Sequence, residues 1–347
     1  MIDKLLRKNI LNLQPYSSAR DEFSGAASIF LDANESPFPH RFNRYPDPHQ
    51  RVLKAAMSKE KNIPTNQIIF GNGSDEIIDL LIRSFCEPGR DSLIICPPTY
   101  GMYAVSANIN EVAINEVSLL SDYQLDVPAI LKAADVRTKL LFICSPNNPT
   151  GNLMNREDII TLLQNFDGMV VVDEAYSDFA PGKSLLSLLS DFENLFIMQT
   201  FSKARGLAGI RLGMGFGHPY LISVLNKVKP PYNVNAFSQQ RALKALDKPE
   251  ILKKNIRAIT RERNRMAQKL HRLSKVEKVF PSDANFLLVR FRHDAVSIYQ
   301  KLIHEGIIVR DRSRVHLCEG SLRLSIGTRR ENDLLFESLK KIAGLPD

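Results

Sequence analysis

Three short apolar runs, each followed at once by polar residues, strongly limit what this chain can fold into. The runs cover residues 140–143, 169–172 and 195–198, and helical patterns such as 156–165 separate several runs of this kind. Alternating strands and helices predict a mostly parallel sheet with right-handed crossover connections. Ligands of open α/β sheets bind beyond the carboxyl ends of the strands. The sequence therefore predicts a single crevice where the polar residues after the runs meet.

Those polar residues are an amide, a carboxylate, a phenol and an amine. Asn148 follows the first run, Asp173 and Tyr176 follow the second, and Lys203 follows the third. A lysine at the end of a buried strand, with hydroxyl neighbours and Arg211 farther along, is typical of an imine-forming amine beside an anion site. Taken singly, Asp173 is more typical of a helix cap and Lys203 of a surface lysine. Because these groups occur together, a catalytic site is favoured over these separate structural roles.

The segment Gly-Asn-Gly-Ser-Asp-Glu at 71–76 indicates an anion site at the start of a helix. It fails as a dinucleotide fingerprint, because Glu76 stands where the third glycine belongs. A glycine turn at a helix N-terminus still presents free backbone N–H groups, although Ser74 or Asp75 could simply cap the helix. Ser202 and Arg211 add a hydroxyl and a guanidinium. Together these groups predict one phosphate held from two sides.

The full set of groups matches one cofactor, pyridoxal phosphate. It requires a carboxylate against the ring nitrogen, an amide and a phenol near the ring oxygen, a lysine that forms an imine, and a phosphate cradle. Tyr100, which follows another strand-like run at 92–96, could lie flat on the ring or simply pack on the domain surface. The seven histidines show no metal-ligand spacing, so no metal is predicted.

Length and composition predict about two domains in an ordinary globular chain of 347 residues, 44% of them hydrophobic. Prolines interrupt residues 1–46, which are expected to form an N-terminal arm and part of a small domain. Residues 47–235 are predicted to form the large domain. After Pro230 and Pro231 long charged helices begin, and residues 236–347 are expected to form a linking helix and a smaller α+β domain.

Charge and cysteine usage bear on partners and compartment. The net charge of +8 and the basic stretch 253–272 invite a nucleic-acid interpretation, but a solvated helix face is the more ordinary explanation and no nucleic-acid-binding motif accompanies it. No apolar run approaches the roughly 18 residues of a membrane span. The cysteines lack CxxC pairing and are read as free buried thiols. A cytoplasmic protein without nucleic-acid or membrane partners is expected.

Several motifs together resemble a known superfamily, the fold-type I pyridoxal-phosphate aminotransferases. They are Asn148-Pro149-Thr150-Gly151, Asp173-x-Ala175-Tyr176, Ser202-Lys203 and Arg211. Within it the chain is most similar to the histidinol-phosphate aminotransferase family, on segments 13–16, 31–37, 43–46, 71–76, 97–103, 309–311 and 322–329. The resemblance implies an α/β fold with a mostly parallel seven-stranded sheet in the large domain and a smaller α+β domain.

The resemblance also implies a role for each matching position. Lys203 would carry the covalent link and shuttle the proton, Asp173 would pair with the ring nitrogen, and Tyr100 would stack on the ring. Asn148 and Tyr176 would hydrogen-bond the ring oxygen. The cofactor phosphate would be held by Ser74, Asp75, Thr200, Ser202 and Arg211, and by Tyr45 of the partner subunit in a homodimer. The substrate would be bound by Arg323, Arg310 and Tyr16.

The implied activity is transamination of L-histidinol phosphate with 2-oxoglutarate, giving imidazole-acetol phosphate and glutamate in histidine biosynthesis. An aromatic amino-acid aminotransferase or a threonine-phosphate decarboxylase of the same fold is the nearest alternative. A transcription regulator that binds the same cofactor would need a DNA-binding domain ahead of this part, where the chain has only its short arm. An SxxK hydrolase fails because Thr200 occupies the place of the serine.

Overall fold

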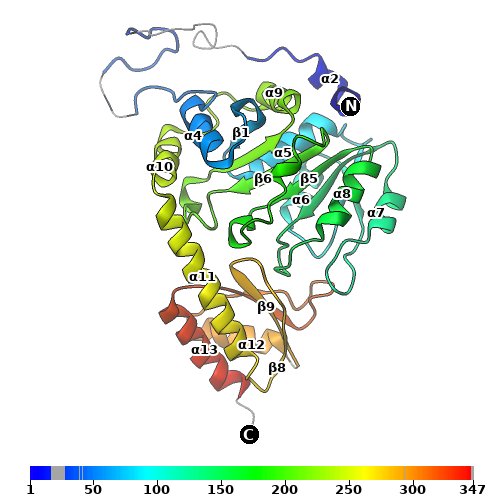
Figure 1. The fold of residues 1–347 in the computed structure, drawn as a ribbon, viewed down its shortest axis with the longest axis vertical. Coiled ribbons are helices and arrows are strands. Elements are labelled where there is room, and N and C mark those ends of the chain that lie inside the picture. The colour runs from blue at the N-terminus through cyan, green and yellow to red at the C-terminus, as the bar shows by residue number, and fades with distance from the viewer. Residues whose placement is uncertain (17–27, 39, 41, 293, 345–347) are drawn as a thin grey trace.

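A seven-stranded sheet carries the larger part of the chain (Figure 1). The computed structural model describes residues 1–16, 28–38, 40, 42–292 and 294–344. The strand order is β1-β7-β6-β5-β4-β2-β3, and only β7 runs against the others. The strands are β1 (Ile68–Gly71), β2 (Ser92–Ile95), β3 (Ala113–Glu116), β4 (Thr138–Cys144), β5 (Met169–Asp173), β6 (Leu195–Thr200) and β7 (Gly213–Gly217). The mostly parallel sheet is confirmed.

Helices cover both faces of this sheet, which explains why its central strands are almost entirely apolar. In β4, Leu141 and Ile143 belong to one core cluster, while Leu140 and Phe142 belong to the cluster on the other face. Strands buried on both sides read as continuous apolar runs. The helices of this unit are α4 (Arg51–Lys61), α5 (Ser74–Phe85), α6 (Met102–Ile109), α7 (Val127–Ala133), α8 (Arg156–Asn165) and α9 (Pro219–Val228), with 3-10 turns η1 (Thr65–Gln67), η2 (Ser177–Phe179), η3 (Leu186–Leu188) and η4 (Ala208–Ile210).

Strands β3 and β7 were not located from the sequence. β7 alternates glycine with larger residues, a pattern that disfavours a strand by propensity. The neighbouring strand supplies the reason for these glycines: a Cβ at Gly215 would lie 2.3 Å from the ring of Phe196, and one at Gly217 would lie 2.8 Å from it. The glycines therefore make room for a buried ring of β6. β3 is short and partly exposed.

The first residues of the chain dock on the large unit, and the predicted arm over residues 1–46 stays a prediction. They form two short helices, α1 (Ile2–Leu5) and α2 (Lys8–Leu11). Ile2, Leu6 and Ile10 are buried in the cluster that includes α5 and α9. Burial of these three apolar side chains holds the segment on the large unit.

A second, smaller unit follows α10 (Ala236–Leu246) and the long helix α11 (Pro249–Leu270), which runs from one unit to the other (Figure 1). Its antiparallel sheet has the order β10-β11-β9-β8 and its own apolar core. The elements are β8 (Val276–Val279), β9 (Phe286–Phe291), α12 (Ala295–His304), β10 (Arg310–Asp311), β11 (Ser321–Ser325) and α13 (Arg329–Ala343). The α+β character is confirmed, and the exact domain boundaries stay predictions.

Two further properties bear on the sequence predictions. All four cysteines are free and buried, as their apolar surroundings suggested. Within the described ranges, none of the helices combines the length and the apolar character needed to cross a membrane.

Candidate active site

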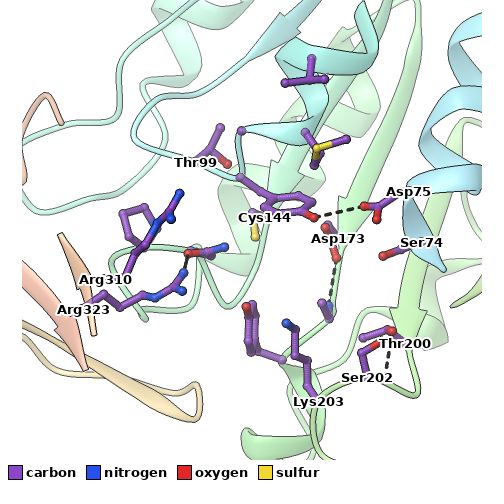
Figure 2. A pocket seen from close by; sticks show the side chains of 18 of the residues that line it. Ser74, Asp75, Thr99, Cys144, Asp173, Thr200, Ser202, Lys203, Arg310 and Arg323 are labelled. Atoms are coloured by element: carbon purple, nitrogen blue, oxygen red, sulfur yellow. Dashed lines mark hydrogen bonds between the residues drawn. The ribbon is translucent and has the colours of Figure 1, made fainter. Parts of the chain in front are cut away.

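A cavity of about 730 Å³ lies at the carboxyl ends of the parallel strands, where the small unit faces the large one. Figure 2 shows Asp173 deep in this cavity, with Ser74, Thr200 and Ser202 on one side and Arg310 and Arg323 on the other. Twelve of the fourteen predicted site residues line it, all but Tyr16 and Tyr45. The strand order therefore brings together residues more than 200 positions apart in the sequence.

Asp173 is a buried carboxylate at the end of β5, only 3% exposed. Its Oδ2 accepts a hydrogen bond from the Tyr103 hydroxyl at 2.7 Å, and its Oδ1 accepts one from the backbone N–H of Ala175 at 3.0 Å. Burial raises the pKa of this carboxyl, and the bond from Tyr103 opposes that rise. A buried carboxylate needs a cationic partner to stay charged. Asp173 is thus suited to pair with a positively charged ring nitrogen.

Lys203 follows β6 and projects into the cavity (Figure 2). Its Nζ lies 5.6 Å from the centre of the Tyr176 ring. Burial lowers the pKa of Lys203, and the nearby charge of Arg323 lowers it further. Since only a neutral amine attacks a carbonyl, this shift favours an imine-forming lysine. Tyr176 is itself buried, and burial raises the pKa of its phenol, so it stays a hydrogen-bond donor.

One end of the cavity is the N-terminus of α5. Its N-cap is Gly73 at φ 82°, with no side-chain cap, so neither Ser74 nor Asp75 has the capping role that was the alternative. A Cβ at Gly73 would lie 2.7 Å from Arg211 Nη2, and one at Gly213 would lie 2.4 Å from the Ser74 nitrogen. Both glycines are therefore required for this close approach. Free N–H groups and a guanidinium converge there, as in anion sites.

The same end is bound together by side-chain contacts. Arg211 Nη2 donates to Asp75 Oδ2 at 3.1 Å, and Tyr100 donates to Asp75 Oδ1 at 3.1 Å. Thr200 Oγ1 accepts from the Ser202 backbone N–H at 3.1 Å. Because Asp75 holds both Tyr100 and Arg211, it fixes the phenol ring relative to the anion site.

The opposite end is formed by arginines of the small unit. Arg323 and Arg310 are directly paired across β11 and β10, so their side chains share one face of that sheet. Arg323 Nη1 donates to Asn148 Oδ1, which joins the small sheet to the loop after β4. Arg323 also lies over the ring of Phe286, with its guanidinium carbon 5.2 Å from the ring centre. This end is therefore basic and spans the two units.

Sequence reasoning missed two residues of this site, one buried behind the cavity and one that lines it. Tyr103 is fully buried, stacks on Phe142 with ring centres 4.8 Å apart, and donates to Asp173. Arg312 lines the cavity beside Arg310. A signal existed for each: Tyr103 stands three residues after Tyr100, in the first turn of α6, and Arg312 stands two residues after Arg310, on the same face of a strand.

Tyr45 and Tyr16 lie outside this cavity. Tyr45 is 51% exposed, stacks on Tyr232 with ring centres 4.5 Å apart, and lines a second cavity of about 620 Å³. Tyr16 is 71% exposed at the end of the first described range. Neither contributes to the site of its own chain, and the predicted roles of both stay predictions.

Comparisons with known proteins agree with this site. Residues 32–339 match the family described as aminotransferase class I and II. The chain is 50% identical to the histidinol-phosphate aminotransferase of Flavobacterium johnsoniae, with 98% of each chain covered. Two solved histidinol-phosphate aminotransferases share the fold. That of Clostridium acetobutylicum has a TM-score of 0.80, 26% identity, and coverage of 86% of this chain and 90% of its own. That of Sinorhizobium meliloti, in complex with pyridoxal-5'-phosphate, has a TM-score of 0.80, 25% identity, and coverage of 90% and 89%.

The chain therefore belongs to the class I and II aminotransferase family, of fold type I. The resemblance to the histidinol-phosphate aminotransferases in particular is confirmed by relatives of that name at about 50% identity over nearly the whole chain. Enzymes of this family act on small molecules and are generally dimeric. Fold-type I aminotransferases use pyridoxal phosphate, which confirms the predicted cofactor.

The residues of this chain fit that cofactor. The cradle at Gly73 and Gly213 is too tight for a side chain but leaves backbone N–H groups open to a phosphate. Asp173 is a buried carboxylate that lacks a cationic partner among the described residues, and Lys203 is an amine with a lowered pKa. These three features are what the phosphate, the ring nitrogen and the aldehyde carbon of the cofactor require.

Proposed function

We propose that this chain transfers the amino group of L-histidinol phosphate to 2-oxoglutarate, giving imidazole-acetol phosphate and glutamate in histidine biosynthesis. Similarity to histidinol-phosphate aminotransferases over nearly the whole chain carries this proposal, since 98% of both chains is matched at 50% identity. The basic end of the cavity supports it, because Arg310 and Arg323 line the cavity side by side, where they could bind the phosphate of this substrate. Guanidinium groups bind both phosphate and carboxylate in a bidentate manner.

The reaction needs negative charge to be stabilised at the substrate carbon that carries the nitrogen. When bound, pyridoxal phosphate supplies an electron-withdrawing ring for this purpose. Asp173 keeps the ring nitrogen protonated, and Tyr103 orients Asp173 through a 2.7 Å hydrogen bond. Asn148 and Tyr176 are proposed to hydrogen-bond the ring oxygen from the loops after β4 and β5. Tyr100, whose hydroxyl is held by Asp75, would cover one face of the ring.

Lys203 is proposed to move the proton. When the substrate nitrogen takes the place of Nζ on the cofactor, the Lys203 amine is free. Its Nζ would then accept the proton from the substrate carbon and deliver it to the carbon of the cofactor. A lysine whose pKa is lowered by burial and by Arg323 serves as a general base more readily than an exposed one. Ser74, Asp75, Thr200, Ser202 and Arg211 would meanwhile hold the cofactor phosphate.

The substrate end must accept two different amino compounds: the donor L-histidinol phosphate, and the glutamate formed in the second half-reaction. L-histidinol phosphate has no carboxylate, whereas glutamate has two. Arg323, which lies nearest the cofactor end through its bond to Asn148, would bind an acidic group of either substrate. Arg310 and Tyr16 would favour the phosphate. The site would thus distinguish L-histidinol phosphate from glutamate by the number of arginines that each engages.

A homodimer with composite sites forms part of the proposal. Large apolar side chains are exposed along the segment that carries Tyr45 and on the nearby helix α10, where a monomer would leave them in water: Ile29, Leu31, Phe38, Phe42 and Phe237. Tyr45 would reach the cofactor phosphate of the partner subunit. Sedimentation velocity tests the dimer, and cofactor retention by a mixture of Tyr45→Phe and Lys203→Ala chains tests the sharing of the site.

We also propose that the enzyme acts in the cytoplasm. Four cysteines that are buried and free are usual in a reducing compartment, and the relatives at about 50% identity bear the name of a bacterial aminotransferase. Fractionation of the cells that make the protein tests this point.

The activity is tested with purified protein that shows the visible absorption of the bound cofactor. Turnover with 2-oxoglutarate is compared for three compounds: L-histidinol phosphate, L-phenylalanine and L-threonine phosphate. We expect the highest kcat/KM for L-histidinol phosphate. Faster amine transfer from phenylalanine, or carbon dioxide release from threonine phosphate at a higher rate, would contradict the proposal.

A further inference from the structure

Three arginines share one face of the small sheet at the substrate end of the cavity. Arg310 and Arg323 are cross-strand partners, and the next pair in the ladder is Asp311 with Leu322. The backbone N–H of Arg312 donates to the Ser321 carbonyl at 3.0 Å, which continues the ladder by one residue. Side chains alternate along a strand, so Arg312 points to the same side as Arg310, away from that of Asp311. All three arginines line the same cavity.

These three guanidiniums have no carboxylate to neutralise them in the described chain. Each ion pair with a described carboxylate involves other residues, and Asp311 accepts a hydrogen bond from the Ser313 backbone at 2.7 Å. The Nε atoms of Arg312 and Arg323 are buried without a hydrogen-bond partner. Leaving a buried charged donor unpaired is costly. The cluster therefore has unused binding capacity for an anion.

The three charges also act on one another. Burial lowers the pKa of Arg312, and the charges of Arg323 and Arg310 lower it further. Burial likewise lowers the pKa of Arg323, with Arg310 adding to the effect. Like charges held together repel, and a doubly charged anion between them would relieve that repulsion more than a singly charged one.

We propose that Arg312 is a third phosphate-binding residue, which makes the substrate site selective for a phosphate dianion over a carboxylate. The inference rests on the proposed function, because it assigns Arg312 to the phosphate of the amino donor. Two arginines suffice for the carboxylates of glutamate. The third adds a buried donor, Nε, that only the larger and more highly charged phosphate would engage.

A neighbouring arginine provides a matched control. Arg314 is exposed and does not line the cavity. The chain turns directly after Arg312, where the Val315 backbone donates to the Arg312 carbonyl at 3.0 Å, so the alternation of the strand ends there. Arg312→Gln and Arg314→Gln remove the same charge two residues apart, inside and outside the cavity.

The experiment measures each half-reaction of the holoenzyme for wild type, Arg312→Gln, Arg312→Lys and Arg314→Gln. Arg312→Gln should raise KM for L-histidinol phosphate by at least about tenfold, the loss of a hydrogen bond to a charged group, with a smaller rise for glutamate. kcat should change little. The KM of Arg312→Lys for L-histidinol phosphate should lie between those of wild type and Arg312→Gln, because its ammonium keeps the charge but lacks Nε. Equal KM values in Arg312→Gln and Arg314→Gln, or equal losses for both donors, would overturn the inference.

A binding measurement separates this result from folding and from the proposed function. Inorganic phosphate should raise the melting temperature of the holoenzyme more for wild type and Arg314→Gln than for Arg312→Gln. Without phosphate, Arg312→Gln should melt no lower than wild type, because it removes a cation that repels Arg310 and Arg323. A lower value would overturn the inference. If wild type itself fails to turn over L-histidinol phosphate, the proposed function fails, whatever the phosphate response.

Discussion

The two ends of the active-site cavity bind anions in different ways. At the cofactor end the charges are paired within the chain: Arg211 contacts Asp75 at 3.1 Å, and the other donors are backbone groups of α5 and hydroxyls after β6. At the substrate end Arg310, Arg312 and Arg323 have no acidic partner in the described chain, and two of their Nε atoms are buried and unpaired.

The difference reflects how long each ligand stays. A cofactor that remains through every cycle can be held by a preset cradle of fixed N–H groups. Substrates are exchanged in each half-reaction, so each incoming substrate must neutralise the arginines at the substrate end again. Changes at the first end should therefore alter the chemical step, and changes at the second should alter KM and the choice of donor. The predictions that follow test this division.

The largest effect is expected for Lys203→Ala at the cofactor end. Loss of the amine should abolish transamination and covalent attachment of the cofactor, while the phosphate cradle should still retain the cofactor non-covalently. Borohydride reduction of wild type followed by peptide mapping should find the cofactor on Lys203. A label on any other lysine would contradict this assignment.

Asp173→Asn should reduce kcat at least about a thousandfold, since each factor of ten is about 1.36 kcal/mol and a neutral amide cannot keep the ring nitrogen protonated. Tyr103→Phe is the graded control: it keeps the carboxylate but removes the hydrogen bond to it. Its loss should be nearer tenfold, about the value of one hydrogen bond to a charged group. Near-normal turnover of Asp173→Asn would refute the role given to the carboxylate.

At the substrate end, Arg310→Ala should weaken the binding of L-histidinol phosphate by about 1.5–3 kcal/mol. The binding of glutamate should weaken by less. Arg323→Ala should impair both half-reactions. The sequence left open that Arg310 forms a surface ion pair with Asp311, but the Asp311 carboxylate bonds to the Ser313 backbone instead. Stopped-flow measurement of each half-reaction distinguishes these effects. Equal losses for both donors in Arg310→Ala would argue against phosphate recognition by Arg310.

The smallest expected effect links the two ends. The charge of Arg323 contributes to the lowered pKa of Lys203, second only to burial. Arg323→Gln should therefore raise the pKa of Lys203, because the protonated amine loses a repelling neighbour, and a smaller share of the amine is neutral at a given pH. In the apoprotein, the rate of borohydride-trapped cofactor attachment should shift to higher pH. Arg310→Gln should shift this pH profile less. An unchanged profile for Arg323→Gln would show that the charge of Arg323 does not influence the pKa of Lys203.

Local sequence determined the central strands of the large sheet and the polar groups at their ends. Continuous apolar runs predicted β4, β5 and β6, and the polar residues after each run predicted Asn148, Asp173 and Lys203 as neighbours. This succeeded because the carboxyl ends of parallel strands meet at one edge. The cofactor end was predictable for the same reason, since its residues adjoin those strands.

Tertiary structure decided what local pattern does not encode. β7 is a strand because its glycines accommodate the ring of Phe196, a contact between two strands that no local propensity contains. Tyr103 supports Asp173 only because α6 and β5 pack together, although the two residues are 70 positions apart in the sequence. Arg312 joins Arg310 and Arg323 through the pairing of β10 with β11. The sequence by itself determined which groups are the candidates for the chemistry. The packing of the two units decided which of them face one another, because burial and charge depend on distances that arise only in the folded chain.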